Sequence, residues 1–354
     1  MSGRVGDTCQ VGGGVEAISV EVTGVAAEVG TVAELGAEVS RQLGRAVPHD
    51  GYMLTGLDPL TRGMCLYTRR HGYGSPAARR LLSDDRLKAD AFSYESLATG
   101  PCRVGVIDAR AARHRHSGWV NEVMAGEGVG SELRIALADG RSLWGALALL
   151  RGTGGRPFSA AEAACAERLT GALVGSLRRF VTGRPLQSFR LERPPGIVVV
   201  RPDGTSASAT ESASEWGAEF TGGPAHACAG EFQSLLWATA YLAPRIGGTA
   251  LTRVPLAGGW AALQAQPLRG AGPDAMAVTV RPTTGTELLP AMAAWHGLTP
   301  REQAVVETAL EGMSAKQIAR RLGVSPYTVN DHLKAIYRKT GVSAREELIA
   351  RLAR

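Results

Sequence analysis

Four helix-start signals follow one another in the last 57 residues, 298–354, and they constrain the fold more than any other feature of the chain. A hydroxyl side chain at the N-cap, proline at the first helical position and Glu or Gln at the third are typical of helix N-termini. Gly323 and Gly341 suit the left-handed residue that ends a helix. Because these signals agree with one another, they predict an all-α domain of four short helices. The signals are Thr299-Pro300-Arg301-Glu302, Ser314-Ala315-Lys316-Gln317, Ser325-Pro326 and Ser343-Ala344-Arg345-Glu346.

The third of these helices divides its faces by chemistry. It follows Leu322-Gly323-Val324-Ser325, a short glycine-containing turn that is typical of a helix-turn-helix. At about 100° per residue, Val329, Leu333 and Ile336 fall on one side and are expected to pack inward. A helix of this size fits the major groove of DNA, where amide and charged side chains contact base edges. The opposite, polar side holds Tyr327, Asn330, Asp331, Lys334 and Arg338.

Positive charge is concentrated in the same segment. Residues 298–354 hold ten Lys or Arg and six Asp or Glu, a formal net charge of +4, whereas the whole chain carries +6. An excess of positive charge on a small domain is the electrostatic footprint expected for a partner such as double-stranded DNA.

Residues along the whole segment match a known pattern without a gap. They are Leu298-Thr299-Pro300-Arg301-Glu302, Gly312, Ser314, Gln317-Ile318-Ala319, Leu322, Val324-Ser325, Thr328-Val329, His332-Leu333, Ile336, Lys339 and Gly341-Val342. With these residues the segment resembles the LuxR-type helix-turn-helix of bacterial transcription regulators. In that family the third helix lies in the major groove, and the fourth often forms a dimer contact.

Carried over by position, the resemblance implies three groups of site residues. The residues expected to contact bases are Asn330, Asp331 and Lys334. The residues expected to contact phosphates are Lys316, Arg321, Tyr327, Thr328, Arg338 and Lys339. The apolar candidates for the subunit contact are Leu348, Ile349 and Leu352, at least one of which must instead pack inside the domain.

Two of these assignments have alternatives. Lys316, Arg321 and Lys339 also fit a solvated basic face. Asp331 would be repelled by phosphates, so it either accepts a hydrogen bond from a cytosine amino group or holds Lys334 or Arg338 in place.

The rest of the chain is bounded by its length and composition. A length of 354 residues predicts two or three domains. No apolar run is long enough to span a membrane, and the N-terminus lacks an apolar signal core, which favours a cytoplasmic protein without a membrane partner. The five cysteines are scattered and form no C-x-x-C pair, so neither disulfides nor structural zinc are expected.

The N-terminal half shows the order of a sensor-like domain. Residues 1–29 are predicted to be mobile, because the first 14 are polar and glycine-rich. Helical spacing then begins near Thr31, two extended segments follow, Asp139-Gly140 predicts a hairpin, and Ser159 begins a long capped helix. This order is similar to that of a GAF domain over residues 30–180. Such domains are small-molecule sensors or dimerisation modules with a pocket on one side of an antiparallel sheet.

Residues 181–195 contain two proline pairs and are predicted to be a linker. Two further hairpin signals and two helical segments follow, in an order similar to a PAS-like domain over residues 196–283. Residues 284–297 are expected to form a connecting helix into the DNA-binding domain at 298–354.

The sequence contains no persuasive catalytic motif. Neither a phosphate-binding G-x-x-x-x-G-K-[ST] loop nor a G-x-S-x-G element is present. In His114-Arg115-His116 the two histidines do not share a helix face, so a metal site is not expected there. We expect Trp119 and Trp144 to pack in a core and not to line a pocket. The same expectation applies to the other tryptophans. We therefore predict no enzyme activity, no metal and no cofactor.

Together these patterns predict a multidomain α+β protein. It would comprise a GAF-like antiparallel sheet with helices, a PAS-like α+β domain and a C-terminal all-α four-helix helix-turn-helix domain. The indicated function is a one-component transcriptional regulator that binds DNA as a homodimer. Its sensor-like domains would respond to an unknown small molecule, and activation would also need a surface for RNA polymerase. The alternative is a constitutive DNA-binding protein or protein-interaction scaffold whose GAF-like and PAS-like domains bind no ligand.

Overall fold

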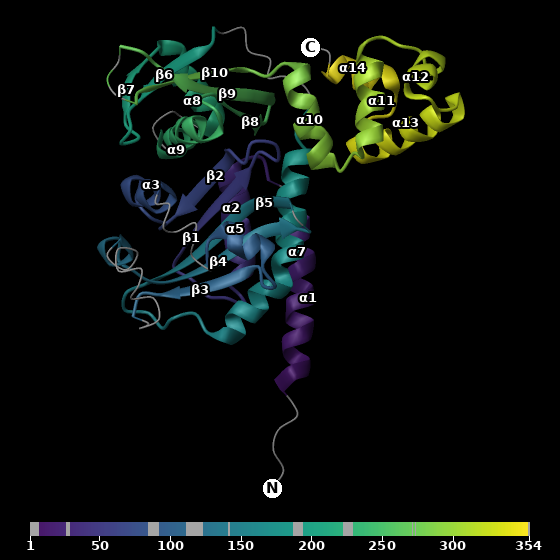
Figure 1. The fold of residues 1–354 in the computed structure, drawn as a ribbon. Coiled ribbons are helices and arrows are strands. Elements are labelled where there is room, and N and C mark those ends of the chain that lie inside the picture. The colour runs from purple at the N-terminus through teal and green to yellow at the C-terminus, as the bar shows by residue number, and fades with distance from the viewer. Residues whose placement is uncertain are drawn as a thin grey trace.

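The structure of the protein is a computed structural model, and it describes residues 7–25, 29–83, 92–110, 123–140, 142–186, 194–221, 229–270, 272 and 274–352. Two antiparallel sheets lie one above the other, and a group of C-terminal helices lies to one side (Figure 1). The predicted combination of α/β domains with a C-terminal helical region is therefore confirmed. His114, His116, Trp119 and part of the predicted linker 181–195 lie outside the described residues.

The N-terminal domain is built on a five-stranded antiparallel sheet with the strand order β2-β1-β5-β4-β3. β4 and β5 form the predicted hairpin, and Gly140 in its turn adopts the left-handed conformation (φ 56°) that favours glycine. β1 pairs with both β2 and β5, so it joins the two hairpins into one sheet. The strands are β1 (Gly51–Leu57), β2 (Met64–Arg70), β3 (Val104–Asp108), β4 (Val129–Asp139) and β5 (Ser142–Gly152).

Helices cover both faces of this sheet. α2 and α7 begin at the predicted capping boxes of Thr31 and Ser159. Along β4, Leu133 packs with the residues of α7, whereas Ala136 packs with those of α5. Since neighbouring side chains of a strand point to opposite faces, α7 and α5 lie on opposite sides of the sheet. The helices are α1 (Asp7–Val25), α2 (Val32–Leu43), α3 (Ser75–Ser83), α5 (Tyr94–Thr99) and α7 (Ala160–Thr182).

The prediction that residues 1–29 form a mobile segment is wrong for α1. Val15, Ile18 and Val22 are buried, and their spacing of three and four residues places them on one face of the helix. This stripe joins the core of the N-terminal domain where α1 runs beside α7 (Figure 1). The glycines before Val15 have low helix propensity, so packing against α7 stabilises a helix that local preference does not indicate.

The middle domain contains a second five-stranded antiparallel sheet, with the order β7-β6-β10-β9-β8. If the strands of each sheet are numbered one to five along the chain, both sheets have the same strand order, 2-1-5-4-3. Both of the further hairpin signals in the sequence form hairpins: Pro202-Asp203-Gly204 joins β6 to β7, and Gly258-Gly259 joins β8 to β9. The elements are β6 (Gly196–Val200), β7 (Ser206–Ala209), α8 (Glu211–Thr221), α9 (Ala229–Leu242), η2 (Ala243–Ile246), β8 (Ala250–Leu256), β9 (Gly259–Pro267) and β10 (Met276–Pro282).

Helix α9 contacts both sheets. Leu235 and Leu236 pack into the core of the middle domain, while α9 also contacts β2 of the N-terminal sheet. Met64 and Tyr67 of β2 belong to the same buried cluster as the residues of α9. The two domains therefore share a hydrophobic core and are not joined by a linker alone.

Helix α10 leads from the middle domain to the C-terminal domain, as predicted for residues 284–297. Thr284 and Glu287 form a capping box at its start. The predicted helix starts at Thr299, Ser314 and Ser325 are confirmed, because each side chain accepts a hydrogen bond from a backbone N–H of its helix. The helices are α10 (Gly285–His296), α11 (Pro300–Leu310), α12 (Ala315–Leu322), α13 (Pro326–Thr340) and α14 (Arg345–Leu352).

The predicted capping box at Ser343 is different in detail. The Ser343 backbone N–H and hydroxyl both donate to the carboxylate of Glu347, at 2.7 and 2.6 Å, and not to that of Glu346. The helix nevertheless begins where the sequence predicts it.

Two observations bear on the environment of the chain. No helix in the described part is both long enough and apolar enough to cross a membrane. Cys65 and Cys165 are buried, and burial raises the pKa of each thiol.

Candidate nucleic-acid interface

Local capping fixes the turn between α12 and α13. Gly323 ends α12 in the left-handed conformation (φ 66°). Ser325 caps α13 by accepting a hydrogen bond from the N–H of Thr328 at 3.1 Å. Ile318 of α12 and Val329 of α13 are fully buried, so the two helices meet on a shared core. The segment thus folds into the predicted helix-turn-helix.

The two faces of α13 are divided as predicted. Val329, Leu333 and Ile336 are buried in the core of the C-terminal domain. The opposite face is exposed, and no element of the other domains covers it in the part of the chain that the structure describes. Tyr327 is 82% exposed, which is unusual for a large aromatic side chain. The exposed side chains of this outer face are Tyr327, Asn330, Asp331, Lys334 and Arg338.

Asp331 lies beside Lys334 on the outer face. Its Oδ1 is 3.5 Å from the lysine Nζ, and the two side chains are 75% and 78% exposed. An ion pair this exposed contributes at most about 1 kcal/mol to stability, but it favours one orientation of the lysine. The geometry is consistent with the positioning role of Asp331, while its contact with a cytosine stays a prediction.

Three phosphate-contact candidates lie around the turn. Lys316 is exposed near the start of α12. Arg321 is exposed near the end of α12, where its Nη1 pairs with Glu311 Oε2 at 3.0 Å. Thr328 is half-buried, and its hydroxyl lies 3.0 Å from that of Ser325. Contact with phosphate stays a prediction for each of them.

Lys339 does not lie on a solvated basic face. Its Nζ donates to the carboxylate of the buried Glu302 at 2.7 Å and to the carbonyl of Gly297 at 3.0 Å. Burial alone would raise the pKa of Glu302, but hydrogen bonds from Lys339 and Thr299 lower it below its ordinary value. The two bonds of Lys339 use two of the three N–H donors of its ammonium group, so a phosphate contact of Lys339 stays a prediction. In this arrangement Lys339 therefore ties the end of α13 to α11.

His296, the last residue of α10, makes a second bond to the same turn of α13. Its Nδ1 lies 2.9 Å from the carbonyl oxygen of Lys339. Because a carbonyl only accepts, this nitrogen carries the proton. Burial lowers the pKa of His296 below its ordinary value, and the nearby Arg178 adds to this, while the bond to Lys339 opposes it.

A pH dependence follows from this histidine. The folded state disfavours the charged ring, so the contribution of His296 to stability is complete above its unfolded pKa, about 6.5. It is lost as the pH falls from there through the lower pKa of the folded state. Between pH 7.5 and pH 5.5 the free energy of unfolding, measured by urea denaturation, should fall less in the His296→Gln variant than in the unsubstituted chain. His49 is a second half-buried histidine whose pKa is lowered by partial burial. The stability of a variant with both histidines replaced should therefore depend on pH even less. Parallel curves for His296→Gln and the unsubstituted chain would contradict this assignment.

Two of the three dimer-contact candidates are buried in the single chain. Leu348 is 0% and Leu352 is 1% exposed, and both belong to the core that α14 forms with α11 and α10. The prediction that packing within the domain claims at least one of the three is confirmed for these two. As placed, they are not available for a subunit contact. Ile349 is half-buried and remains the candidate.

A buried junction ties α10 to the N-terminal domain. Trp295 of α10 packs on Trp144 of β5, with the ring centroids 4.8 Å apart. Arg178 of α7 lies over the Trp144 ring at 4.6 Å, and its Nη2 donates to the Trp295 carbonyl at 2.9 Å. Trp144 is therefore a packing residue, as expected. Since His296 follows Trp295 directly, this junction leads to the end of α13.

Residues 296–352 match the family model of bacterial regulatory proteins of the luxR family. Residues 296–352 are a LuxR-type helix-turn-helix domain. The family that this domain matches consists of regulatory proteins.

The curated relatives match the LuxR-type domain. A Mycobacterium tuberculosis (strain H37Rv) protein named as an HTH-type transcriptional regulator is 48% identical over 60 residues, which are 17% of this chain and 7% of that protein. The transcriptional regulatory protein UhpA of Escherichia coli K12 is 46% identical over 55 residues, which are 16% of this chain and 28% of UhpA. The chain thus spans less than a third of the length of these relatives.

Solved structures give weaker likenesses. Escherichia coli SdiA is 12% identical, with 95% of each chain covered and a TM-score of 0.34. The chromophore-binding domain of the Stigmatella aurantiaca bacteriophytochrome is 14% identical, with 50% of this chain and 62% of that one covered and a TM-score of 0.31. At these TM-scores the likenesses establish neither a shared fold nor a shared function.

The sequence did not indicate a polar cluster inside the N-terminal domain. Glu132 and Arg134 alternate with Leu133 and Ile135 along β4, a pattern that predicts one core face and one solvent face. Both are nevertheless buried, because helices cover this second face as well. One residue in the sequence indicates that this second face is covered: Ala136 is apolar and lies on the same face as Glu132 and Arg134.

Proposed function

We propose that the chain is a sequence-specific DNA-binding transcriptional regulator. The observation that carries this proposal is the exposed polar face of α13 on a LuxR-type domain with a formal net charge of +4. A recognition helix presents such a face to the major groove, and the surrounding positive charge supplies affinity for the phosphates.

In this proposal Asn330, Asp331 and Lys334 contact base edges. The amide of Asn330 suits adenine, which presents one donor and one acceptor in the major groove, and Lys334 suits guanine. Phosphate contacts come from both ends of the helix-turn-helix. Their candidates are Lys316, Arg321, Tyr327, Thr328 and Arg338.

The proposal includes a homodimer that binds two half-sites about one helical turn apart. Ile349 on α14 keeps part of its surface exposed. Val20 on α1 is 74% exposed and supplies a second apolar surface for contact with another subunit.

We further propose that the N-terminal domain, of GAF type, and the middle domain, of PAS type, control DNA binding. The support is the junction through which Arg178 and Trp295 connect α7 to α10, and His296 connects α10 to Lys339. Because these contacts hold the last turn of α13, a movement of α10 would change the orientation of the recognition helix. If the N-terminal and middle domains serve only as a scaffold, DNA binding should not depend on these contacts.

Selection from sheared genomic DNA tests the proposal. Purified full-length protein is incubated with the fragments, and the retained DNA is sequenced. We expect enrichment of an inverted repeat, as a symmetric dimer requires. Failure of the full-length protein to enrich any sequence over input would count against a sequence-specific regulator.

Two lysine variants separate base contact from phosphate contact. Lys334→Ala is expected to weaken binding to the selected site by about 1–3 kcal/mol and to affect random DNA much less. Lys316→Ala is expected to weaken binding to both DNAs alike and to lower the slope of log K against log salt by about 1. Fluorescence anisotropy at several salt concentrations measures both effects. Equal losses on specific and random DNA for both variants would refute these assignments.

A further inference from the structure

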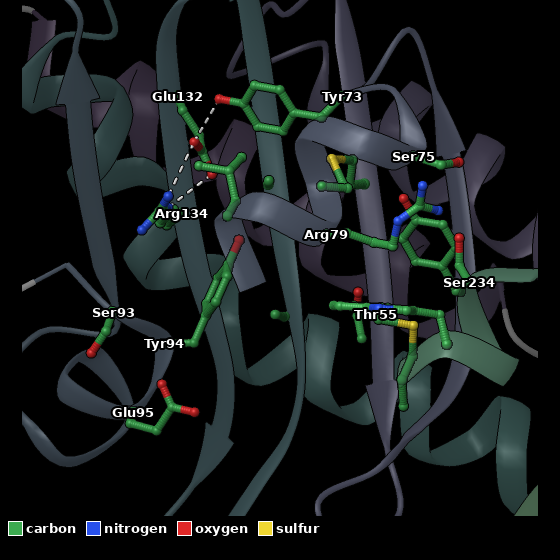
Figure 2. Close-up of a pocket in the computed structure, with 18 residues that line it drawn as sticks. Thr55, Tyr73, Ser75, Arg79, Ser93, Tyr94, Glu95, Glu132, Arg134 and Ser234 are labelled. Carbon is green, nitrogen blue, oxygen red and sulfur yellow. Dashed lines mark hydrogen bonds and ion pairs between the residues drawn. The ribbon is translucent and has the colours of Figure 1, made fainter. Parts of the chain in front are cut away.

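A cavity of about 170 Å³ lies on the face of the N-terminal sheet that α5 covers. Its floor comes from β1, β2, β4 and β5, and its walls come from α3, α5 and α9 (Figure 2). Ser234 and Trp237 of α9 belong to the middle domain, so two domains build the cavity. Trp237 thus has a role beyond the core packing expected from the sequence.

One end of the cavity carries a buried ion pair. Glu132 and Arg134 are 3% and 5% exposed, with Arg134 Nε 2.8 Å from Glu132 Oε1. The Tyr73 hydroxyl donates to Glu132 Oε2 at 2.9 Å, and Arg134 Nη2 lies 3.3 Å from the same oxygen. Both oxygens of Glu132 are therefore engaged, and the pair has no net charge.

The same end presents unused hydrogen-bond donors. Arg134 has five N–H groups, of which three donate to Glu132 and to the carbonyl of Phe92 among the described residues. The Tyr94 hydroxyl points toward the ion pair (Figure 2). Burial raises the pKa of Tyr94, and the charge of Glu132 adds to this, so the phenol keeps its proton and can donate it in a hydrogen bond to a ligand.

The remaining walls are mostly apolar and aromatic. Met53, Met64, Tyr67 and Trp237 line them, and burial raises the pKa of Tyr67 to about 12. The small Ala148 on β5 leaves space above the sheet. A cavity of this size is comparable to one that holds a single aromatic ring.

We propose that this cavity binds a small, neutral aromatic molecule that carries a carbonyl group. The ring would lie against the apolar walls between the two domains. The carbonyl would accept hydrogen bonds from Arg134 and Tyr94. At this end of the cavity a carboxylate is disfavoured because Glu132 already neutralises Arg134, while Arg79 lines another part of the wall. A pure hydrocarbon would leave the donors without an acceptor. The proposal deepens the proposed sensor role and rests on it only for the effect on DNA.

Three probes of similar size and shape test this chemistry on the full-length protein. Acetophenone is neutral with a carbonyl, benzoate carries a charge, and cumene has neither a carbonyl nor a charge. Ligand-observed NMR titration gives their relative affinities. We expect acetophenone to bind about fivefold or more tightly than cumene, as one hydrogen bond allows, and about tenfold or more tightly than benzoate. Equal or tighter binding of benzoate or cumene would overturn the proposed ligand class.

Substitutions then locate the site. Ala148→Leu fills the cavity and should abolish acetophenone binding, whereas Ala161→Leu makes the same change on an exposed part of α7 and should leave binding unchanged. Tyr94→Phe removes one donor without changing the shape of the side chain, so it should weaken acetophenone about fivefold and leave cumene unaffected. Circular dichroism confirms that each variant is folded. Undiminished acetophenone binding by folded Ala148→Leu would exclude this cavity as the site.

DNA binding is measured in its own experiment, so that the cavity proposal and the regulator proposal can be contradicted independently. Saturating acetophenone should change the affinity of the chain for its selected DNA and leave that of Ala148→Leu unchanged. If acetophenone binds but the chain enriches no DNA, the cavity assignment stands and the regulator proposal fails. If DNA is enriched but acetophenone does not bind, the cavity assignment fails alone.

Discussion

Arg253→Met is expected to destabilise the contact between the N-terminal and middle domains by about 3–5 kcal/mol, because it leaves a buried carboxylate without its counter-ion. Arg253 Nη1 lies 2.9 Å from Asp58 Oδ2, and the two side chains are 9% and 0% exposed. The backbone N–H of Arg253 donates to the same oxygen at 3.0 Å, and its Nε donates to the carbonyl of Glu287. One arginine thus joins the β1–β2 turn, the second sheet and the start of α10.

Urea denaturation monitored by tryptophan fluorescence measures this loss, with each transition fitted separately. Asp58→Asn combined with Arg253→Met should recover part of the stability, because no unpaired charge remains. The matched control is Arg41→Met, which removes the 63% exposed partner of Glu38 and should leave the stability almost unchanged. A loss at Arg253 no larger than at Arg41 would mean that the buried pair does not hold the domains together.

Trp295→Ala is expected to have a comparable effect on the junction between α10 and the N-terminal domain. Trp295 is 1% exposed, and truncation of a buried tryptophan costs about 3–5 kcal/mol. The substitution removes the contact with Trp144, so α10 should open more often. Hydrogen exchange of the α10 amides should accelerate on the order of a hundredfold or more.

Trp216→Ala provides the matched control for this experiment. Trp216 is 0% exposed but lies in the core of the middle domain. Its truncation should destabilise that domain without selectively exposing α10. Trp295→Phe should retain part of the ring contact and give an intermediate exchange rate. Unchanged protection of α10 in Trp295→Ala would show that the tryptophan pair does not couple the domains.

The C-terminal domain was predictable because its signals are local. A capping side chain, a proline and a glycine act within one helical turn of the position that they specify. The alternation of apolar and polar residues on α13 likewise depends only on helix geometry. Val329 and Leu333 are buried and Lys334 is exposed, as this periodicity predicts.

Other features depend on neighbours that are distant in the sequence. Helix α1 is stabilised where its stripe of Val15, Ile18 and Val22 meets α7, a packing partner that the local sequence does not specify. Lys339 matches a basic position of the recognition helix, yet Glu302, 37 residues away, takes up its charge.

The sequence by itself determined the elements whose stability comes from a single turn or a single face: the helix caps, the hairpin turns and the recognition helix of the LuxR-type domain. Only the tertiary structure decided which polar side chains are buried. Glu132 and Arg134 became part of a cavity because α5 and α9 cover their side of the sheet. The physical reason is that periodicity reports which residues share a face, whereas burial depends on whether another element packs against that face.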